Sequence, residues 1–188
     1  MTERVDTDRD LMTAAQRGDG VAFDELVRRH TATMYRVAFR VLGDRAEAED
    51  AVQEAWVSAW RSLGRFRGDA APTTWLYRVV TNSALGQARR RRAVPMDISD
   101  ESMNHLLSDG GTGNPEGQAV RSEEADLVHR AIATLEPSQR VPLVLREFEG
   151  MSYEEIAEVL EVNTTALRAR LHRARLALLS RLEEMRRG

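Results

Sequence analysis

The chain has 188 residues, a formal net charge of −3 and no cysteine, which excludes disulfides, thiolate zinc sites and a thiol nucleophile. It holds no run of about eighteen apolar residues and does not begin with the apolar stretch of a secretory signal, so we expect no membrane insertion and a cytoplasmic location. The four histidines are scattered singly. Because metal sites need clustered ligands, we expect no metal, and nothing indicates another cofactor.

The charges are segregated in blocks along the chain. Residues 44–60 hold five acids and one arginine, and residues 61–93 hold eight arginines and one acid. Residues 94–126 hold eight acids and one arginine, whereas residues 164–188 hold seven arginines and two acids. The small net charge therefore hides surfaces of opposite sign. All the cations are arginines, which suit phosphate and guanine, although a general bias toward arginine and alanine explains their number better.

Apolar residues recur at helical spacing over residues 8–93 and predict a first, helical domain. Within it Glu47, Asp50 and Glu54 lie at i, i+3 and i+7 and so share one helix face, while Val52 and Trp56 face the core. An acidic stripe of this kind suits a basic partner. A merely solvated face is the simpler explanation when the residues are taken alone.

The segment from Phe66 to Asn82 interleaves aromatic residues with arginines around a turn at residues 68–72. Such a mixture suits single-stranded DNA, because bases stack on aromatic rings and arginine follows the backbone. The alternative is that the aromatic residues belong to the core, which we favour for Trp75 because it shares a face with Val79. The arginine run 89–92 either grips phosphates or stabilises a helix C-terminus.

Residues 94–120 contain two prolines, the sequence Gly110-Gly-Thr-Gly-Asn-Pro and an excess of acids. This composition predicts a flexible acidic linker. Helical periodicity returns over residues 121–188, the second predicted domain. Its first helix is expected over residues 122–135, before Pro137, and its second is expected to stop at Gly150. The fold class is therefore all-α, with two small helical domains.

A helix-turn-helix pattern follows Gly150. Ser152 and Glu155 form a capping box that starts one helix, and Asn163 is a good N-cap for a helix that runs from Thr164 past Leu178. Leu167, Leu171, Ala174 and Leu178 form one apolar stripe along the second helix. The face away from the stripe carries Arg168, His172, Arg173 and Arg175. This face fits the DNA major groove, and the alternative is a basic helix whose arginines are only solvated.

These motifs resemble those of a known family. Gly150-Met-Ser-Tyr-Glu-Glu-Ile-Ala and Arg168-Ala-Arg-Leu-His-Arg-Ala-Arg are similar to region 4 of sigma factors. Leu42-Gly-Asp-Arg-Ala-Glu-Ala-Glu-Asp, Trp75-Leu-Tyr-Arg-Val-Val-Thr-Asn and the arginine run 89–92 resemble region 2 of the extracytoplasmic-function (ECF, group IV) sigma factors of the sigma-70 family. The resemblance covers nearly the whole chain outside the linker, in the order expected for that minimal class.

The resemblance implies a transcription initiation factor that is not an enzyme. Its partners would be bacterial core RNA polymerase, promoter DNA and an anti-sigma factor. The polymerase would bind the acidic face with Glu47, Asp50, Gln53 and Glu54. The promoter −10 element would be bound and melted by Phe66, Arg67, Arg78, Asn82, Arg89 and Arg90. The −35 element would be read by Arg168, His172, Arg173, Arg175, Ala166 and Ala169, with Arg146 and Tyr153 at phosphates.

Two departures from the family pattern fall in the second helix of the helix-turn-helix. Ala166 stands where a threonine is usual, and Ala169 stands where a serine is usual. Both changes remove a hydroxyl group, so we expect a less polar reading of the −35 element. In addition, the resemblance would bring the acidic linker, including Asp97 and Asp109, near the active-site cleft of the polymerase. A simple acidic tether is an equally good explanation.

Two other functions would explain part of the sequence pattern. An ordinary transcription regulator would share the helix-turn-helix, but it leaves the acidic face and the aromatic and arginine segment unexplained. An enzyme on a helical scaffold would need a phosphate-binding glycine-rich loop, a metal-ligand cluster or a nucleophile with its base, and the spacing of the residues offers none of these.

Overall fold

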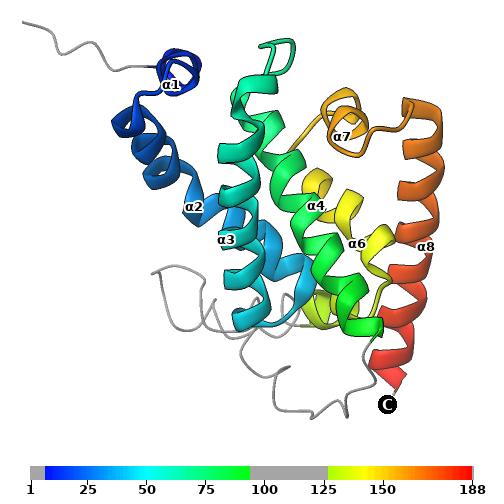
Figure 1. Ribbon diagram of the computed structural model, residues 1–188. Helices are drawn as coiled ribbons and strands as arrows, with labels where there is room; N and C mark the ends of the chain where they lie inside the picture. Colours follow the sequence, from blue (N-terminus) through cyan, green and yellow to red (C-terminus); the bar gives the residue numbers. More distant parts are fainter. Residues whose placement is uncertain (1–6, 94–126, 188) are drawn as a thin grey trace, which may run out of the picture.

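The computed structural model describes residues 7–93 and 127–187, and within these ranges all regular secondary structure is helical (Figure 1). The predicted all-α fold is confirmed. The predicted linker over residues 94–120, including Asp97 and Asp109, lies outside the described residues. In the described part of the chain no helix is long and apolar enough to cross a membrane.

The first half consists of α1 (Asp8–Gln16), α2 (Gly20–Leu42), α3 (Arg45–Ser62), a short 3-10 turn η1 (Leu63–Arg65) and α4 (Pro72–Ala93). Polar caps set the starts of the first three helices. The Thr7 side chain forms a capping box with Asp10, and Asp19 and Asp44 accept hydrogen bonds from backbone N–H groups of α2 and α3. Gly43 ends α2 in a left-handed conformation with φ of 77°.

Small side chains allow α3 to lie close against its neighbours. Ala48, Ala51, Ala55 and Ala59 are completely buried along one face of α3, and α3 packs on both α2 and α4. The alanines leave room for the larger side chains of those two helices. Because α3 contacts its neighbours through this inner face, its outer face remains available to solvent. A smaller cluster around Leu11, Met12 and Leu26 joins α1 to the start of α2 and to η1.

The second half contains a helical stretch over residues 127–133, α6 (Pro137–Leu143), a π-helical turn η3 (Val144–Phe148), α7 (Tyr153–Val159) and α8 (Thr164–Arg187). The helix that was expected to stop at Gly150 ends just before it, at Phe148, but changes to π geometry after Leu143. Pro142 lies inside α6 and has no N–H group for a helical hydrogen bond, and a wider turn follows it.

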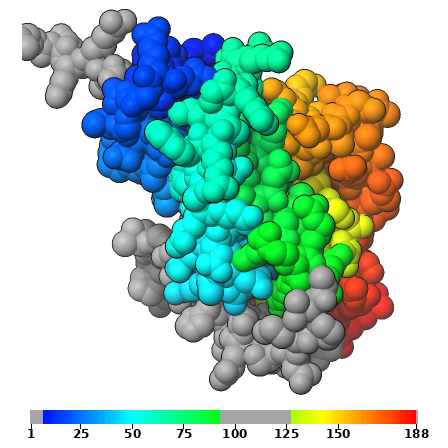
Figure 2. Space-filling model, in the orientation of Figure 1, coloured from blue at the N-terminus to red at the C-terminus, as the bar shows by residue number. Residues whose placement is uncertain are grey.

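The two halves pack against each other. One cluster of buried side chains runs from α2, α3 and α4 through α6 and η3 to α7 and α8. In Figure 1 α7 lies beside the N-terminal half of α4, and α6 lies between α4 and α8, in agreement with the contacts between these helices. The space-filling view shows the orange surface of α7 directly against the blue-green and green surface of the first half (Figure 2).

Candidate nucleic-acid interface

The helix-turn-helix is built by two capped helices and a tight turn. The Ser152 hydroxyl accepts from the Glu155 backbone N–H at 3.1 Å, and the Glu155 carboxylate accepts from the Ser152 N–H at 2.7 Å, so the predicted capping box is confirmed. These bonds to Ser152 lower the pKa of Glu155. The Asn163 side chain accepts from the Ala166 N–H at 2.7 Å and caps α8. Local sequence thus sets where both helices start.

The expected recognition face of α8 is exposed. Leu167, Leu171 and Ala174 are fully buried beneath α8, as the apolar stripe predicted, although Leu178 is only half-buried. The side chains expected to meet DNA bases or phosphates are exposed in the structure, with Ala166 half-buried; they are Arg168, Ala169, His172, Arg173 and Arg175. One basic face is therefore presented to solvent.

Arg146 and Tyr153 are held in a small cluster beside the start of α8. The Arg146 guanidinium donates to the Met151 carbonyl at 2.6 Å and lies 4.9 Å from the centre of the Tyr153 ring. Arg168 lies over the same ring at 5.8 Å. Because Tyr153 contacts both guanidinium groups, it orients Arg168 as well as Arg146. Arg175 donates to Glu147 at 2.7 Å, and that bond raises its pKa.

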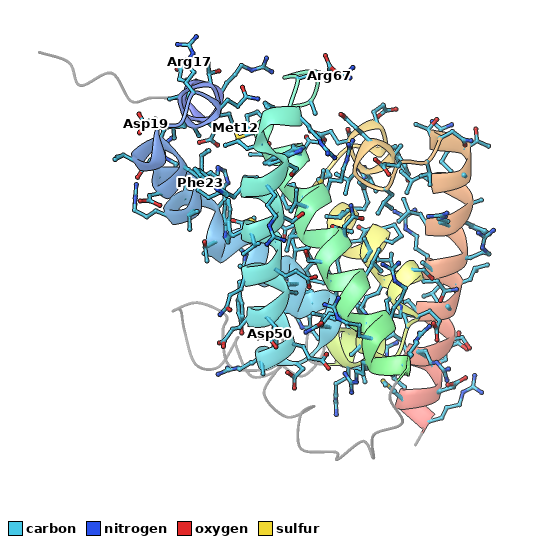
Figure 3. The ribbon with its side chains drawn as sticks, viewed as in Figure 1. Met12, Arg17, Asp19, Phe23, Asp50 and Arg67 are labelled. Atoms are coloured by element: carbon cyan, nitrogen blue, oxygen red, sulfur yellow. The ribbon has the colours of Figure 1, made fainter. Side chains whose placement is uncertain are left out.

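The candidate −10 residues differ in exposure and in their contacts. Arg67 lies exposed in the loop before α4, at the opposite end of α3 from Asp50 (Figure 3), and Asn82 is also exposed. Phe66 is half-buried against Trp75, with ring centres 5.5 Å apart. The half-buried Trp75 packs on both buried clusters, as favoured from the sequence. Arg78 points toward the second half of the chain, where it donates to the Glu158 carbonyl at 3.0 Å and lies 3.5 Å from the Glu161 carboxylate.

The basic end of α4 lies against the acidic face of α3. Arg90 pairs with Glu54 at 2.6 Å, and Arg91 pairs with Glu47 at 3.4 Å, while Arg89 is exposed. Burial raises the pKa of the Glu47 carboxyl, and the nearby Arg91 opposes that shift.

Two predicted binding surfaces are therefore in contact through these pairs. Asp50 and Gln53 are exposed on the same outer face of α3. The described acids and histidines nowhere cluster in a way that suits a metal ion.

Several polar residues of the structure carry no local sequence signal. Glu149 accepts from Arg40 at 3.0 Å and from the Tyr77 hydroxyl at 2.9 Å. Arg140 is buried and donates to the carbonyls of Val41 and Leu135. Burial is the main reason that the pKa of Tyr77 is raised, and the Glu149 carboxylate adds to it. Apart from Leu135, which is five positions from Arg140, the partners are 72 to 109 positions apart in the sequence, so periodicity could not reveal them.

An all-helical chain with an exposed basic helix behind a capped turn defines a helix-turn-helix protein of the nucleic-acid-binding class. Residues 26–94 match the family described as Sigma-70 region 2, and residues 125–178 match Sigma-70, region 4. The chain belongs to the sigma-70 family, in the extracytoplasmic-function group, and is a sigma factor that directs transcription from promoters.

Similar proteins extend over almost the whole chain. It is 40% identical to the RNA polymerase sigma-H factor of Pseudomonas aeruginosa over 178 residues, which cover 91% of each chain. It is 34% identical to the ECF RNA polymerase sigma-E factor of Escherichia coli K12, with 98% of each chain covered. The solved structure of CnrH, in complex with the cytosolic domain of CnrY, shares 27% identity and a TM-score of 0.67 over 95% of this chain and 99% of CnrH.

Proposed function

We propose that this sigma factor divides promoter recognition between α8 and α4 and binds core RNA polymerase through the outer face of α3. The single observation that carries the proposal is the joint exposure, in one chain, of a basic helix-turn-helix face, of Arg67 in the loop before α4 and Asn82 on α4, and of an acidic helix face. No ordinary regulator of transcription needs all three surfaces.

The −35 element is read by the exposed face of α8. Arg168, His172 and Arg173 contact base edges in the major groove, where arginine pairs with guanine O6 and N7. Arg175 contacts phosphate. Arg146 and Tyr153 support the start of the helix, because the Tyr153 ring contacts the guanidinium groups of both Arg146 and Arg168. The alanines at 166 and 169 offer methyl groups, so this part of the site favours thymine methyls over hydrogen-bonded bases.

The −10 element is captured as a single strand by the loop over residues 66–74 and by α4. Asn82 reads a base, and Arg67 and Arg78 follow the backbone. Phe66 is packed on Trp75, so only part of its ring is available for stacking on a base. Stacking contributes about 1 to 3 kcal/mol per base, enough to offset the few kcal/mol that unstacking costs. Arg89 and Arg90 then hold the adjacent duplex through phosphates.

The polymerase binds the face of α3 that carries Glu47, Asp50, Gln53 and Glu54. The chemistry of RNA synthesis belongs to the polymerase, and this chain supplies binding alone. It therefore works in the cytoplasm, where the polymerase transcribes. An anti-sigma factor regulates it by covering these surfaces. The complex of CnrH with the cytosolic domain of CnrY supports a protein partner of this kind.

Reconstituted transcription tests the proposal. Purified chain is mixed with bacterial core polymerase and a library of genomic promoter fragments, and transcript start sites are mapped. The expected result is a set of new starts that share −35 and −10 sequences and depend on the chain. Absence of both a stable complex with core and a promoter-specific transcript would contradict the proposal.

A single variant then tests the melting role. Asn82→Ala is expected to lose promoter opening, measured by permanganate reactivity of unpaired thymines, while it still binds the duplex −35 element. Asn82 is exposed, so its loss does not disturb packing. Equal loss of opening and of duplex binding would contradict a role for Asn82 in melting. Asp24→Ala, an exposed change on α2 outside the proposed binding surfaces, is the matched control for folding.

A further inference from the structure

Helix α1 lies against η1 and the start of the loop over residues 66–74, which the proposed function assigns to the −10 strand. The Gln16 side chain donates from Nε2 to the Leu63 carbonyl at 2.9 Å and to the Phe66 carbonyl at 2.6 Å. Both hydrogens of one amide group are therefore engaged. The backbone N–H of Phe66 donates to the same Leu63 carbonyl at 3.1 Å and closes η1. Gln16 thus ties the two ends of this turn to α1.

A second side chain of α1 reaches further along the loop. The Nη1 of Arg9 donates to the Gly68 carbonyl at 3.3 Å. Gly68 has a φ of 79°, in the left-handed region that favours glycine, and the chain bends there. Arg9 and Gln16 are seven positions apart, about two turns of helix, so they share one face of α1. This face follows the backbone from Leu63 to Gly68.

The loop also packs on the apolar side of α1. Met12 is fully buried in a cluster that includes η1, and Phe66 and Trp75 pack against this cluster. The Phe66 ring lies 5.5 Å from the Trp75 ring. In Figure 3 Met12 of α1 and Arg67 of the loop lie at the same end of the molecule. Phe66 is therefore held at its carbonyl by Gln16 and at its ring by Trp75.

These contacts leave the basic groups of the segment exposed. The three carbonyls of Leu63, Phe66 and Gly68 accept from α1, whereas the side chains of Arg65 and Arg67 are exposed. A DNA strand is attracted by guanidinium groups and repelled by carbonyl oxygens. Holding the carbonyls against α1 therefore favours approach of DNA from the other side. In addition, the entropy of ordering the loop is lost on folding rather than on binding.

Helix α1 lies outside the segment that the family match covers. The match to Sigma-70 region 2 begins at residue 26, whereas α1 ends at Gln16. The match therefore assigns no role to α1. Burial of Met12 would be enough to hold α1 on the core. The two side-chain donors are additional, and they act on the backbone conformation of the loop.

We propose that α1 positions the −10 loop. Gln16 and Arg9 hold the backbone over residues 63–68 in the conformation that receives an unpaired base of the −10 element, and so set both the rate of promoter opening and the selectivity for the captured base. The inference rests on the proposed role of this loop in −10 binding. Gln16 and Arg9 are positioning residues, because they act through the backbone that carries Phe66 and Arg67.

The test removes the donors from the full chain. The double variant Gln16→Met with Arg9→Met loses all three hydrogen bonds, and methionine keeps an unbranched side chain with a high helix propensity. Arg17→Met is the matched control, because Arg17 is an exposed arginine directly after α1 and its loss changes the charge equally. Gln16→Met alone removes two of the bonds without a change in charge. It keeps the test valid if circular dichroism shows that the double variant is poorly folded.

The first measurement is made on the free chain. The chain has no cysteine, so Asp69→Cys, at an exposed position in the loop, carries a single nitroxide spin label. The electron paramagnetic resonance line shape reports how freely the label moves. We expect a more mobile label in the double variant, a smaller increase in Gln16→Met and no change in Arg17→Met.

The second measurement uses unlabelled chain with core polymerase and a promoter found in the transcription assay. Opening is followed by the fluorescence of 2-aminopurine placed in the −10 element. We expect the double variant to open the promoter about ten-fold more slowly, which corresponds to about 1.4 kcal/mol and is close to the contribution of one or two net hydrogen bonds. Affinity for the −35 duplex should stay within about two-fold of the parent, because α8 is distant from the changes.

Selectivity is measured by replacing each −10 base in turn. A loosened loop accepts other bases more readily, so the ratio of opening rates between the preferred base and its replacements is expected to fall about three-fold or more in the double variant. Arg17→Met should keep the ratio of the parent. A change in selectivity separates a positioning role from a general loss of stability, which would lower all rates alike.

The outcomes are distinguishable. An unchanged spin-label line shape overturns the inference, as does a mobile loop that still opens the promoter at the parental rate and selectivity. Equal losses in Arg17→Met, which would reflect charge alone, overturn it too. Failure of the parent chain to start any transcription would instead contradict the proposed function, and the spin label would still report whether α1 orders the loop.

Discussion

Arg90 on α4 donates to Glu54 on α3 at 2.6 Å, so a residue proposed to hold DNA phosphate is paired with one proposed to bind polymerase. Both side chains are about half exposed, and a pair of this kind contributes less than about 1 kcal/mol to stability. Binding of polymerase to Glu54 would release Arg90. The polymerase-binding face of α3 and the phosphate-binding end of α4 are therefore coupled, and breaking the ion pair between them costs little free energy.

Arg90→Ala is expected to weaken promoter binding by the holoenzyme for all sequences alike. It should also reduce the slope of log affinity against log salt by about one, because one phosphate contact is lost. Thermal stability should barely change. The measurement is a salt titration of promoter affinity, with Arg61→Ala, an exposed arginine on α3, as control. An unchanged salt slope would contradict the phosphate contact.

Glu54→Gln is expected to weaken binding to core polymerase, because it removes one carboxylate from the acidic face of α3 and keeps its size. Free chain and core are compared by fluorescence anisotropy at two salt concentrations. Glu184→Gln, an exposed acid near the end of α8, is the control. If both variants bind core as the parent does, the α3 face is not the polymerase-binding surface.

Arg168→Ala is expected to cost about 1 to 3 kcal/mol in binding to the duplex −35 element and to relax preference at one base pair. Arg175→Ala, in contrast, should weaken binding uniformly, because Arg175 is assigned to phosphate. Selection of −35 sequences from a randomised pool separates the two effects. Loss of sequence preference in Arg175→Ala, with preference kept in Arg168→Ala, would reverse these assignments.

Arg140→Ala is expected to lower the free energy of unfolding by about 3 kcal/mol, because the carbonyls of Val41 and Leu135 lose a buried donor and a cavity remains. Urea unfolding measures the change. Arg130→Ala, an exposed position in the same half, should change stability by less than about 0.5 kcal/mol. Similar stability of both variants would show that Arg140 is not a buried anchor in solution.

Ser152→Ala is expected to destabilise the helix-turn-helix by about 1 kcal/mol, since it removes one side of the capping box. The pKa of Glu155 is lowered in the folded chain, so its contribution to stability is present above the ordinary pKa of glutamate and is lost as pH falls through the lowered value.

The variant keeps the Ser152 backbone N–H that donates to the Glu155 carboxylate and loses only the smaller contribution of the hydroxyl, so the parent should lose stability on acidification slightly more steeply than the variant. Urea unfolding between pH 7 and pH 3 tests this, with Ser138→Ala, an exposed serine in α6, as control. Equal pH dependence in parent and variant would contradict a contribution of the Ser152 hydroxyl to the lowered pKa of Glu155.

The helix-turn-helix could be predicted from the sequence, because its signals are local. A capping residue and its partner are three positions apart, and an apolar stripe repeats every three or four residues. Ser152, Glu155 and Asn163 therefore act as predicted, and the exposed face of α8 follows from the buried Leu167 and Leu171. Resemblance of whole motifs to sigma factors supplied the function, which periodicity alone could not.

What covers each remaining helix face depends on contacts between residues that are distant in the sequence. Tyr77 and Glu149 are 72 positions apart, and Arg40 and Glu149 are 109 apart. Helical spacing shows that Tyr77 and Arg78 lie on a helix with Asn82, but it contains no information on which distant element packs against them. Which element packs there depends on long-range packing and on the pairing of every buried charge. As a result Asn82 is exposed, whereas Arg78 is paired with the second half of the chain.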